Sequence, residues 1–277
     1  MIKPTVIRQA QKRRKKRLGR QPAAYGRRDV TDMRYDTAIF DMDGTVLDTV
    51  TDLRNAVNWA FEQTGHRHDF SLEDAKAFFG SGVEVAVSRA LIMEKLGGNA
   101  GDDGMLDELL KVGDTTGVKD YGISETELNR IAGVYRPYYD AHCNEHTGPY
   151  PGIPELLKSL RARGIRTAVV SNKPDEAVRT LADSLFPDQF DFVLGEKSGI
   201  RRKPAPDMTD TCLKVLGSSR SRAVYIGDTE IDLKTAANAG LDCISVTWGF
   251  RGRRFLEAHH AKFIADTAEE VEAYFAQ

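Results

Sequence analysis

Short apolar runs alternate with amphipathic stretches through the C-terminal part of the chain. The runs predict buried strands, and the stretches carry apolar residues at helical spacing. The predicted strands are GIRTAVVSN, FDFVLG, RAVYIGD and LDCISVTWG, and the predicted helices are KPDEAVRTLADSLF, APDMTDTCLKVLG, TEIDLKTAANAG and TAEEVEAYFAQ. Strands that alternate with helices favour a parallel sheet covered on both faces.

One further predicted strand, YDTAIFDMD, lies far upstream. A helical pattern follows it, with Thr51 as the expected cap and Gly65 as the expected stop. From about residue 71 to 145 the pattern is helical. We therefore predict an α/β fold in which an all-helical insertion interrupts a doubly wound parallel sheet. The predicted core comprises residues 35–50 and 147–277, and the predicted insertion comprises residues 51–146.

Charge separates the first 34 residues from the rest. They hold twelve of the 39 Lys and Arg residues but only two of the 41 Asp and Glu residues. A basic arm can bind nucleic acid or an anionic surface, but this one has no zinc-ligand spacing and little aromatic content. We interpret residues 1–34 as a basic, disordered extension and expect no nucleic-acid partner. A targeting segment and an upstream translation start remain alternatives.

Composition narrows the class further. Hydrophobic residues make up 41% of the chain and charged residues 29%, which is typical of a globular protein. No apolar run approaches the roughly 18 residues of a membrane span, so no membrane partner is expected. The cysteines are Cys143, Cys212 and Cys243; they are widely spaced and odd in number, which favours a reducing, cytoplasmic setting. The sequence leaves the oligomeric state open.

Polar residues gather where the predicted strands end. In a doubly wound sheet, ligands bind beyond the carboxyl ends of the strands. The residues at or beside these ends are Asp41, Asp43, Ser171, Asn172, Lys203, Asp228 and Asp232.

These residues suit the chemistry of phosphoryl transfer. Asp41 and Asp43 are two carboxylates separated by one residue. They repel each other unless a cation or a raised pKa relieves the repulsion. With the two later aspartates they form an all-oxygen cluster of the kind that Mg²⁺ prefers. A lysine, a hydroxyl and turn amides could bind the anionic oxygens. Any one of these residues also fits a structural role, and that interpretation stays open for Asn172 and Lys173.

Four segments in order, DMDGTVLDT, VVSNK, KPAPD and IGDTEID, resemble the four motifs of the haloacid dehalogenase superfamily. The resemblance spans residues 36–250. The segments YPGIPELLKSLRARGIRTAVVSNKPDE and TWGFRG are similar to phosphoglycolate phosphatases, and the helical insertion matches the cap domain of that subgroup.

The resemblance implies a role for each motif residue. Asp41 would be the nucleophile that becomes an aspartyl-phosphate, and Asp43 would be the general acid and then the general base. Asp41, the main-chain carbonyl of Asp43, and Asp228 would hold Mg²⁺, with Asp232 supporting the site from outside the ligand shell.

Other residues would bind substrate. Ser171 and Lys203 would bind the transferring phosphoryl group, assisted by Asn172 and the amides of Gly44 and Thr45. In the cap, Ser81 and Gly82 precede a predicted helix whose N-terminus would bind a small carboxylate. An ordinary turn and helix cap fits these two cap residues equally well.

The predicted function is Mg²⁺-dependent hydrolysis of a small phosphorylated substrate, 2-phosphoglycolate first among the candidates. Pyrophosphate or another small phosphate ester would use the same residues. A β-phosphoglucomutase-like mutase would need proton-shuttling cap residues, which we do not identify. A phosphonate hydrolase would need a Schiff-base lysine, and neither Lys76 nor Lys95 has a recognisable context. The intact catalytic set argues against a non-enzymatic, nucleic-acid-binding role.

Overall fold

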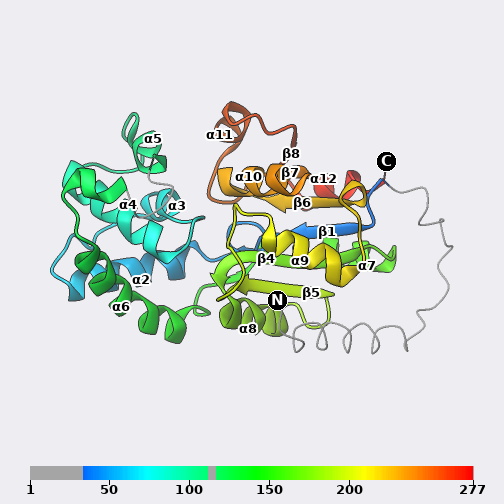
Figure 1. Ribbon diagram of the computed structural model, residues 1–277, viewed down its shortest axis with the longest axis horizontal. Helices are drawn as coiled ribbons and strands as arrows, with labels where there is room; N and C mark the ends of the chain where they lie inside the picture. Colours follow the sequence, from blue (N-terminus) through cyan, green and yellow to red (C-terminus); the bar gives the residue numbers. More distant parts are fainter. Residues whose placement is uncertain (1–33, 112–116, 277) are drawn as a thin grey trace. The chain divides into compact units, whose positions relative to one another are not determined.

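A computed structural model of the chain describes residues 34–111 and 117–276. Residues 1–33 of the predicted basic extension lie outside this part. The described chain forms two compact units (Figure 1). One unit contains the residues up to Val46 together with those from Pro149 onward, and the other is Leu47–Gly148.

The first unit is built on a six-stranded sheet in which every pair is parallel. In spatial order the strands are β5 (Phe192–Glu196), β4 (Arg166–Pro174), β1 (Thr37–Phe40), β6 (Ala223–Gly227), β7 (Asp242–Val246) and β8 (Phe263–Ala265). All four residues of β1 and all five of β6 are buried, as expected for central strands covered on both faces.

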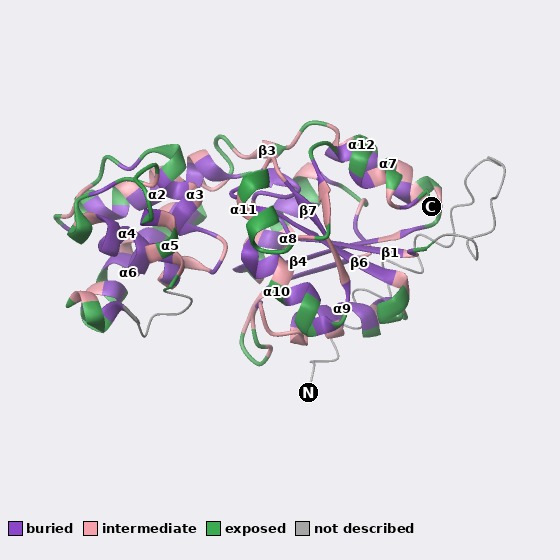
Figure 2. Ribbon diagram, turned by 90° about the horizontal axis from the view of Figure 1, so that it is seen from above, coloured by how far each residue is buried: buried purple, intermediate pink, exposed green. Residues whose placement is uncertain are grey.

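Helices cover both faces of this sheet (Figure 2). Helices α7 and α12 pack together on one side, and α9 and α10 pack together on the other. The helices of this unit are α7 (Ile153–Ala162), α8 (Asp175–Leu185), α9 (Asp207–Leu216), α10 (Glu230–Ala239), α11 (Arg253–Ala258) and α12 (Ala268–Ala273), with a 3₁₀ turn at Arg220–Arg222.

The apolar core of the sheet includes Ile39, Val170, Tyr225 and Cys212, all buried. Burial raises the pKa of the Cys212 thiol, so this cysteine is an inert core residue. No disulfide joins Cys143, Cys212 or Cys243 in the described chain.

The second unit is the helical insertion. Its elements are α2 (Val50–Gln63), α3 (Leu72–Phe78), α4 (Val83–Leu96), α5 (Met105–Leu110), a 3₁₀ turn at Gly117–Tyr121, and α6 (Glu125–His142). A two-stranded sheet of β2 (Leu47–Asp48) and β3 (Gly148–Pro149) lies where the chain enters and leaves it. The parallel sheet with its inserted helical domain confirms the predicted fold class.

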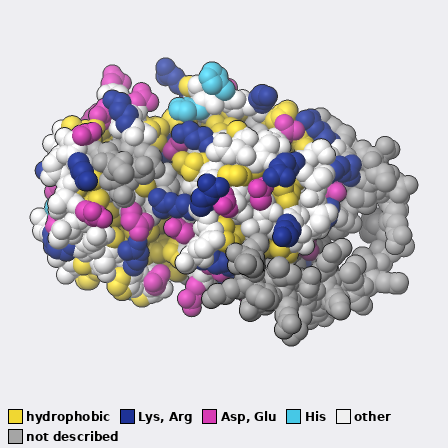
Figure 3. Space-filling view, viewed as in Figure 1, with side chains coloured by type: hydrophobic (Ala, Val, Ile, Leu, Met, Phe, Trp, Pro, Cys, Tyr) yellow, Lys and Arg dark blue, Asp and Glu magenta, His cyan; other side chains and the backbone are white. Residues whose placement is uncertain are grey.

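Basic and acidic side chains are interspersed on the face shown in Figure 3. Exposed ion pairs of the described chain include Arg220 with Asp210 and Arg253 with Asp266. Every helix of the described chain is too short or too polar to span a membrane.

Candidate active site

Asp41 is the first residue after β1, and the sheet fixes its position. Its amide donates to the carbonyl of Ile226 in β6 at 2.9 Å. One carboxylate oxygen accepts the amide of Met42 at 2.7 Å, and the other lies 2.9 Å from Nζ of Lys203. The residue is 5% exposed. The backbone therefore presents a buried carboxylate at the carboxyl end of a central strand.

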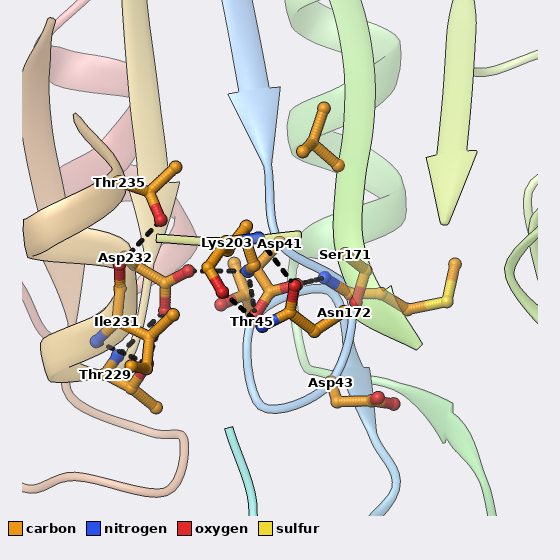
Figure 4. A network of polar contacts seen from close by, with 12 residues as sticks. Asp41, Asp43, Thr45, Ser171, Asn172, Lys203, Thr229, Ile231, Asp232 and Thr235 are labelled. Atoms are coloured by element: carbon orange, nitrogen blue, oxygen red, sulfur yellow. Dashed lines mark hydrogen bonds and ion pairs between the residues drawn. The ribbon is translucent and has the colours of Figure 1, made fainter. Parts of the chain in front are cut away.

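Lys203 is buried between two carboxylates, as Figure 4 shows. Its Nζ lies 2.8 Å from Oδ1 of Asp232 as well as 2.9 Å from Asp41. Burial by itself would lower the pKa of Lys203, but the charges of Asp232 and Asp41 outweigh it and raise that pKa well above 10.5. The ammonium group therefore stays charged beside the carboxylate of Asp41.

Asp41, Asp228 and Asp232 form a buried carboxylate cluster in which one oxygen of each lies within 4.8 Å of the others. Burial is the main cause that raises the pKa of Asp41 to about 6; Lys203 opposes this effect and Asp232 adds to it. Burial, Asp232 and Asp41 likewise raise the pKa of Asp228 well above 3.8. Lys203 contacts two of these three buried carboxylates, those of Asp41 and Asp232. An all-oxygen set with this excess of negative charge fits a divalent cation.

Asp232 has both oxygens engaged within the chain. Its Oδ1 accepts from Lys203, and its Oδ2 accepts from the amide and hydroxyl of Thr229 at 3.0 and 2.8 Å. Thr229 in turn caps α10. Asp232 thus orders the start of α10 and holds Lys203, which fits a supporting position outside a metal's ligand shell.

The turn after β1 needs a glycine. Gly44 has φ of 79°, and a Cβ at this position would lie 2.2 Å from Oδ2 of Asp228. Next to it, the hydroxyl of buried Thr45 donates to Oδ1 of Asp228 at 2.9 Å. The amide of Thr45 donates to the carbonyl of Met42 at 3.3 Å, so Thr45 contributes to the site chiefly through its hydroxyl. This turn brings the β1 end against Asp228.

Asp43 lies apart from the cluster. Its side chain points away from Asp41 and Lys203 in Figure 4. Both of its carboxylate oxygens accept from Nζ of Lys173, at 2.8 and 3.0 Å. The Lys173 side chain is 2% exposed. Sequence reasoning left Lys173 without a role, and its position directly after Ser171 and Asn172 was the signal that could have suggested one.

The polar end of β4 contributes two further residues. Ser171 is buried, and its hydroxyl accepts the amide of Lys173 at 3.4 Å. The Asn172 side chain was expected at the phosphate, but both of its polar ends contact the backbone of Lys203. Its Nδ2 donates to the Lys203 carbonyl at 3.1 Å, and its Oδ1 accepts the Lys203 amide at 2.9 Å. Asn172 therefore positions Lys203.

The helical unit has its own polar feature at the start of α4. Ser81 is 4% exposed, and its hydroxyl has no hydrogen-bond partner within the described chain. Gly82 is the N-cap of the 14-residue helix, with φ of 90° and no side-chain cap. Arg89, two turns on, is buried and donates to the carbonyls of Ala77 and Phe78.

Comparison with known proteins agrees with this geometry. Residues 38–246 match the family model of haloacid dehalogenase-like hydrolases. A phosphoglycolate phosphatase from Pseudomonas syringae pv. tomato is 31% identical over 231 residues, which cover 82% of this chain and 75% of that protein.

Solved structures show the same fold. A structure from Lactobacillus delbrueckii subsp. bulgaricus, provisionally assigned as a phosphoglycolate phosphatase, has a TM-score of 0.81 at 56% identity and covers 88% of this chain and 100% of that one. A haloacid dehalogenase-like protein from Streptococcus pneumoniae has a TM-score of 0.69 at 22% identity, with 87% and 99% covered; it supports the fold alone.

The chain belongs to the haloacid dehalogenase-like hydrolases. Within that family it is a phosphatase, a hydrolase of phosphoric monoesters.

Proposed function

We propose that the protein hydrolyses 2-phosphoglycolate to glycolate and phosphate, with Mg²⁺ as cofactor, in the cytoplasm. The observation that carries the chemistry is the buried contact of Lys203 with Asp41 beside the Asp228 carboxylate. The substrate is inferred from relatives that bear the name phosphoglycolate phosphatase, at 30 and 31% identity over 82% of this chain. The three cysteines form no disulfide in the described chain, which supports a reducing compartment.

In the first proposed step, a carboxylate oxygen of Asp41 attacks phosphorus, and the bond from phosphorus to the glycolate oxygen breaks. Asp43, in its protonated form, donates its proton to the departing alkoxide. Lys203 offers positive charge to the phosphoryl oxygens beside Asp41, with the hydroxyl of Ser171 as a further donor. The product of this step is an aspartyl-phosphate on Asp41 and free glycolate.

In the second step, the Asp43 carboxylate takes a proton from water, and the water oxygen attacks the phosphorus of the aspartyl-phosphate. The acyl-phosphate bond breaks, which returns the Asp41 carboxylate and releases phosphate. Asp43 must turn from its contact with Lys173 to reach the departing alkoxide in the first step and the water in the second. Asp41, the main-chain carbonyl of Asp43, and Asp228 would hold Mg²⁺, which when bound neutralises phosphate charge and orients the phosphoryl group.

Ser81 and Gly82 are the proposed contacts for the substrate carboxylate. A buried hydroxyl without a partner and a helix N-terminus with no side-chain cap supply donors for a small anion.

The test is a panel of phosphomonoesters and pyrophosphate assayed with Mg²⁺. We expect phosphoglycolate to have the highest kcat/KM. Asp41→Asn should lower kcat by about 10³-fold or more, because the amide is a poor nucleophile. The control is Asp48→Asn, which changes an exposed carboxylate further along the chain and should leave kcat at the wild-type value. Full turnover in Asp41→Asn would overturn the mechanism. A low rank for phosphoglycolate would overturn the substrate and leave the phosphatase class intact.

A further inference from the structure

The segment Thr247–Gly252, TWGFRG, contacts the candidate active site although no catalytic motif includes it. It follows β7 and leads into α11. The indole Nε1 of Trp248 donates to the carbonyl of Thr45 at 3.1 Å. A Cβ on Gly249 would lie 2.2 Å from the carbonyl oxygen of Gly44 and 2.3 Å from Oδ2 of Asp228. The segment therefore packs directly on the turn after β1, and only a glycine allows that approach.

Phe250 connects this segment to Asp228. Its amide donates to Oδ2 of Asp228 at 2.7 Å, while Thr45 donates to Oδ1 of the same carboxylate at 2.9 Å. Two donors on opposite oxygens fix the plane of the carboxylate. Each oxygen has a second lone pair, so both remain able to accept a cation. The orientation of Asp228 thus depends on where the backbone of residue 250 lies.

A buried ion pair anchors the next residue. Nε of Arg251 lies 3.1 Å from Oε2 of Glu230, and its Nη2 lies 3.5 Å from Oε1. Arg251 is 2% exposed and Glu230 is 5% exposed. The guanidinium carbon also lies 5.5 Å from the ring centre of Phe255. Glu230 is the first residue of α10 and lies two positions after Asp228.

This arrangement is poorly explained by stability alone. Burying both charges costs solvation free energy that their attraction often only offsets, and well-packed apolar side chains commonly stabilise such a position as much or more. A fixed geometry is what the ion pair adds. It ties the segment that supplies the Phe250 amide to the helix that begins directly after Asp228.

We propose that Glu230 and Arg251 are positioning residues for the divalent-cation site, acting through the Phe250 amide on Asp228. This inference rests on the proposed function, because it assumes that Asp228 is a metal ligand. Removing the hydrogen-bond partner of a metal-ligating side chain typically weakens metal affinity by about 10- to 100-fold.

The test is the dissociation constant of Mg²⁺, measured by calorimetry on the full chain. Glu230→Met combined with Arg251→Met replaces both members of the ion pair by apolar side chains. We expect a melting temperature without metal close to that of wild type and a Kd for Mg²⁺ raised roughly 10-fold. The matched control is Arg220→Met combined with Asp210→Asn, which removes an exposed ion pair outside this segment; its Kd should equal that of wild type.

A second variant keeps the experiment informative if the double variant does not fold. Arg251→Lys retains the charge but loses the planar guanidinium, so we expect a smaller rise in Kd with the fold preserved. Folded variants that bind Mg²⁺ as tightly as wild type would overturn the positioning role and leave the proposed function standing. A wild-type protein that binds no divalent cation would overturn the metal site itself, and this inference with it.

Discussion

Lys173 contacts both carboxylate oxygens of Asp43 and is almost completely buried. A buried ammonium needs a counter-charge, and Asp43 supplies one at 2.8 Å. The contact holds Asp43 in one orientation away from Asp41. In the proposed mechanism Asp43 must leave this contact to transfer a proton and then return. We therefore expect Lys173 to affect the rate of the proton-transfer steps.

Replacing Lys173 tests this role. Lys173→Met keeps the length of the side chain and removes its charge, so Asp43 loses its partner. We expect kcat to fall by up to roughly 10²-fold, within the range of a general acid–base contribution, with a smaller effect on KM. The control is Lys197→Met, because Lys197 pairs with Asp175 instead. A wild-type kcat in Lys173→Met would show that the Lys173–Asp43 contact is structural only.

At the scale of the elements, one network joins three segments of the helical unit. His66, just after α2, lies between Glu94 of α4 and Glu127 of α6. Arg130, one turn along α6, also contacts Glu127. Hydrogen bonds from Arg130 and His66 lower the pKa of Glu127 to about 2. Because the folded-state pKa is depressed below the ordinary 4.5, this carboxylate stabilises the fold above about pH 4.5 and loses that effect as pH falls toward 2.

Glu127→Gln should therefore lower the free energy of unfolding at pH 7. Since Arg130 is about half exposed, solvent screens the pair and the loss should be only about 0.5–1 kcal/mol. The difference from wild type should shrink as pH falls from about 5 to 3. Urea unfolding across this pH range measures it, with exposed Glu62→Gln on α2 as the control. A difference that stays constant with pH would rule out ionised Glu127 as its cause.

The start of α2 differs from the start that the local sequence pattern predicts, whereas its end agrees. The helix after the first strand was expected to begin with Thr51 as its cap, but α2 starts at Val50 with Thr49 as its N-cap. The Asp48 carboxylate accepts the amide of Val50 at 3.3 Å, so the chain enters the helix earlier than the Thr51 hydroxyl suggests. The end of the helix agrees with the predicted stop at Gly65, because α2 ends at Gln63 and Gly65 follows with φ of 77°.

At the scale of the whole molecule, the carboxylate cluster links metal binding to stability. Burial raises the pKa of Asp41 to about 6 and that of Asp228 well above 3.8, so near pH 7 the folded protein is under electrostatic strain that a divalent cation would relieve. We expect Mg²⁺ at 100 times its Kd to raise the free energy of unfolding by about 2.7 kcal/mol. Thermal unfolding with Mg²⁺ and with a chelator measures the difference.

Variants separate this effect from general ionic stabilisation. Asp228→Asn removes one proposed ligand and should abolish most of the Mg²⁺-dependent rise. Asp210→Asn, at an exposed carboxylate paired with Arg220, should leave the rise unchanged. Equal responses in both variants would mean that the cation acts elsewhere.

The sequence by itself determined the α/β fold class and the gathering of Asp41, Lys203 and Asp228 at one edge of the sheet. Both depend on local periodicity and on the rule that parallel strands end together. The family motifs added the class of reaction.

Only the tertiary structure decided which partners these residues have. Lys173 contacts Asp43, Asn172 contacts the backbone of Lys203, and Arg251 contacts Glu230. The first two contacts join residues that lie 130 and 31 positions apart, and the third spans 21. Side-chain orientation and burial at such separations follow from packing, which a single sequence does not display.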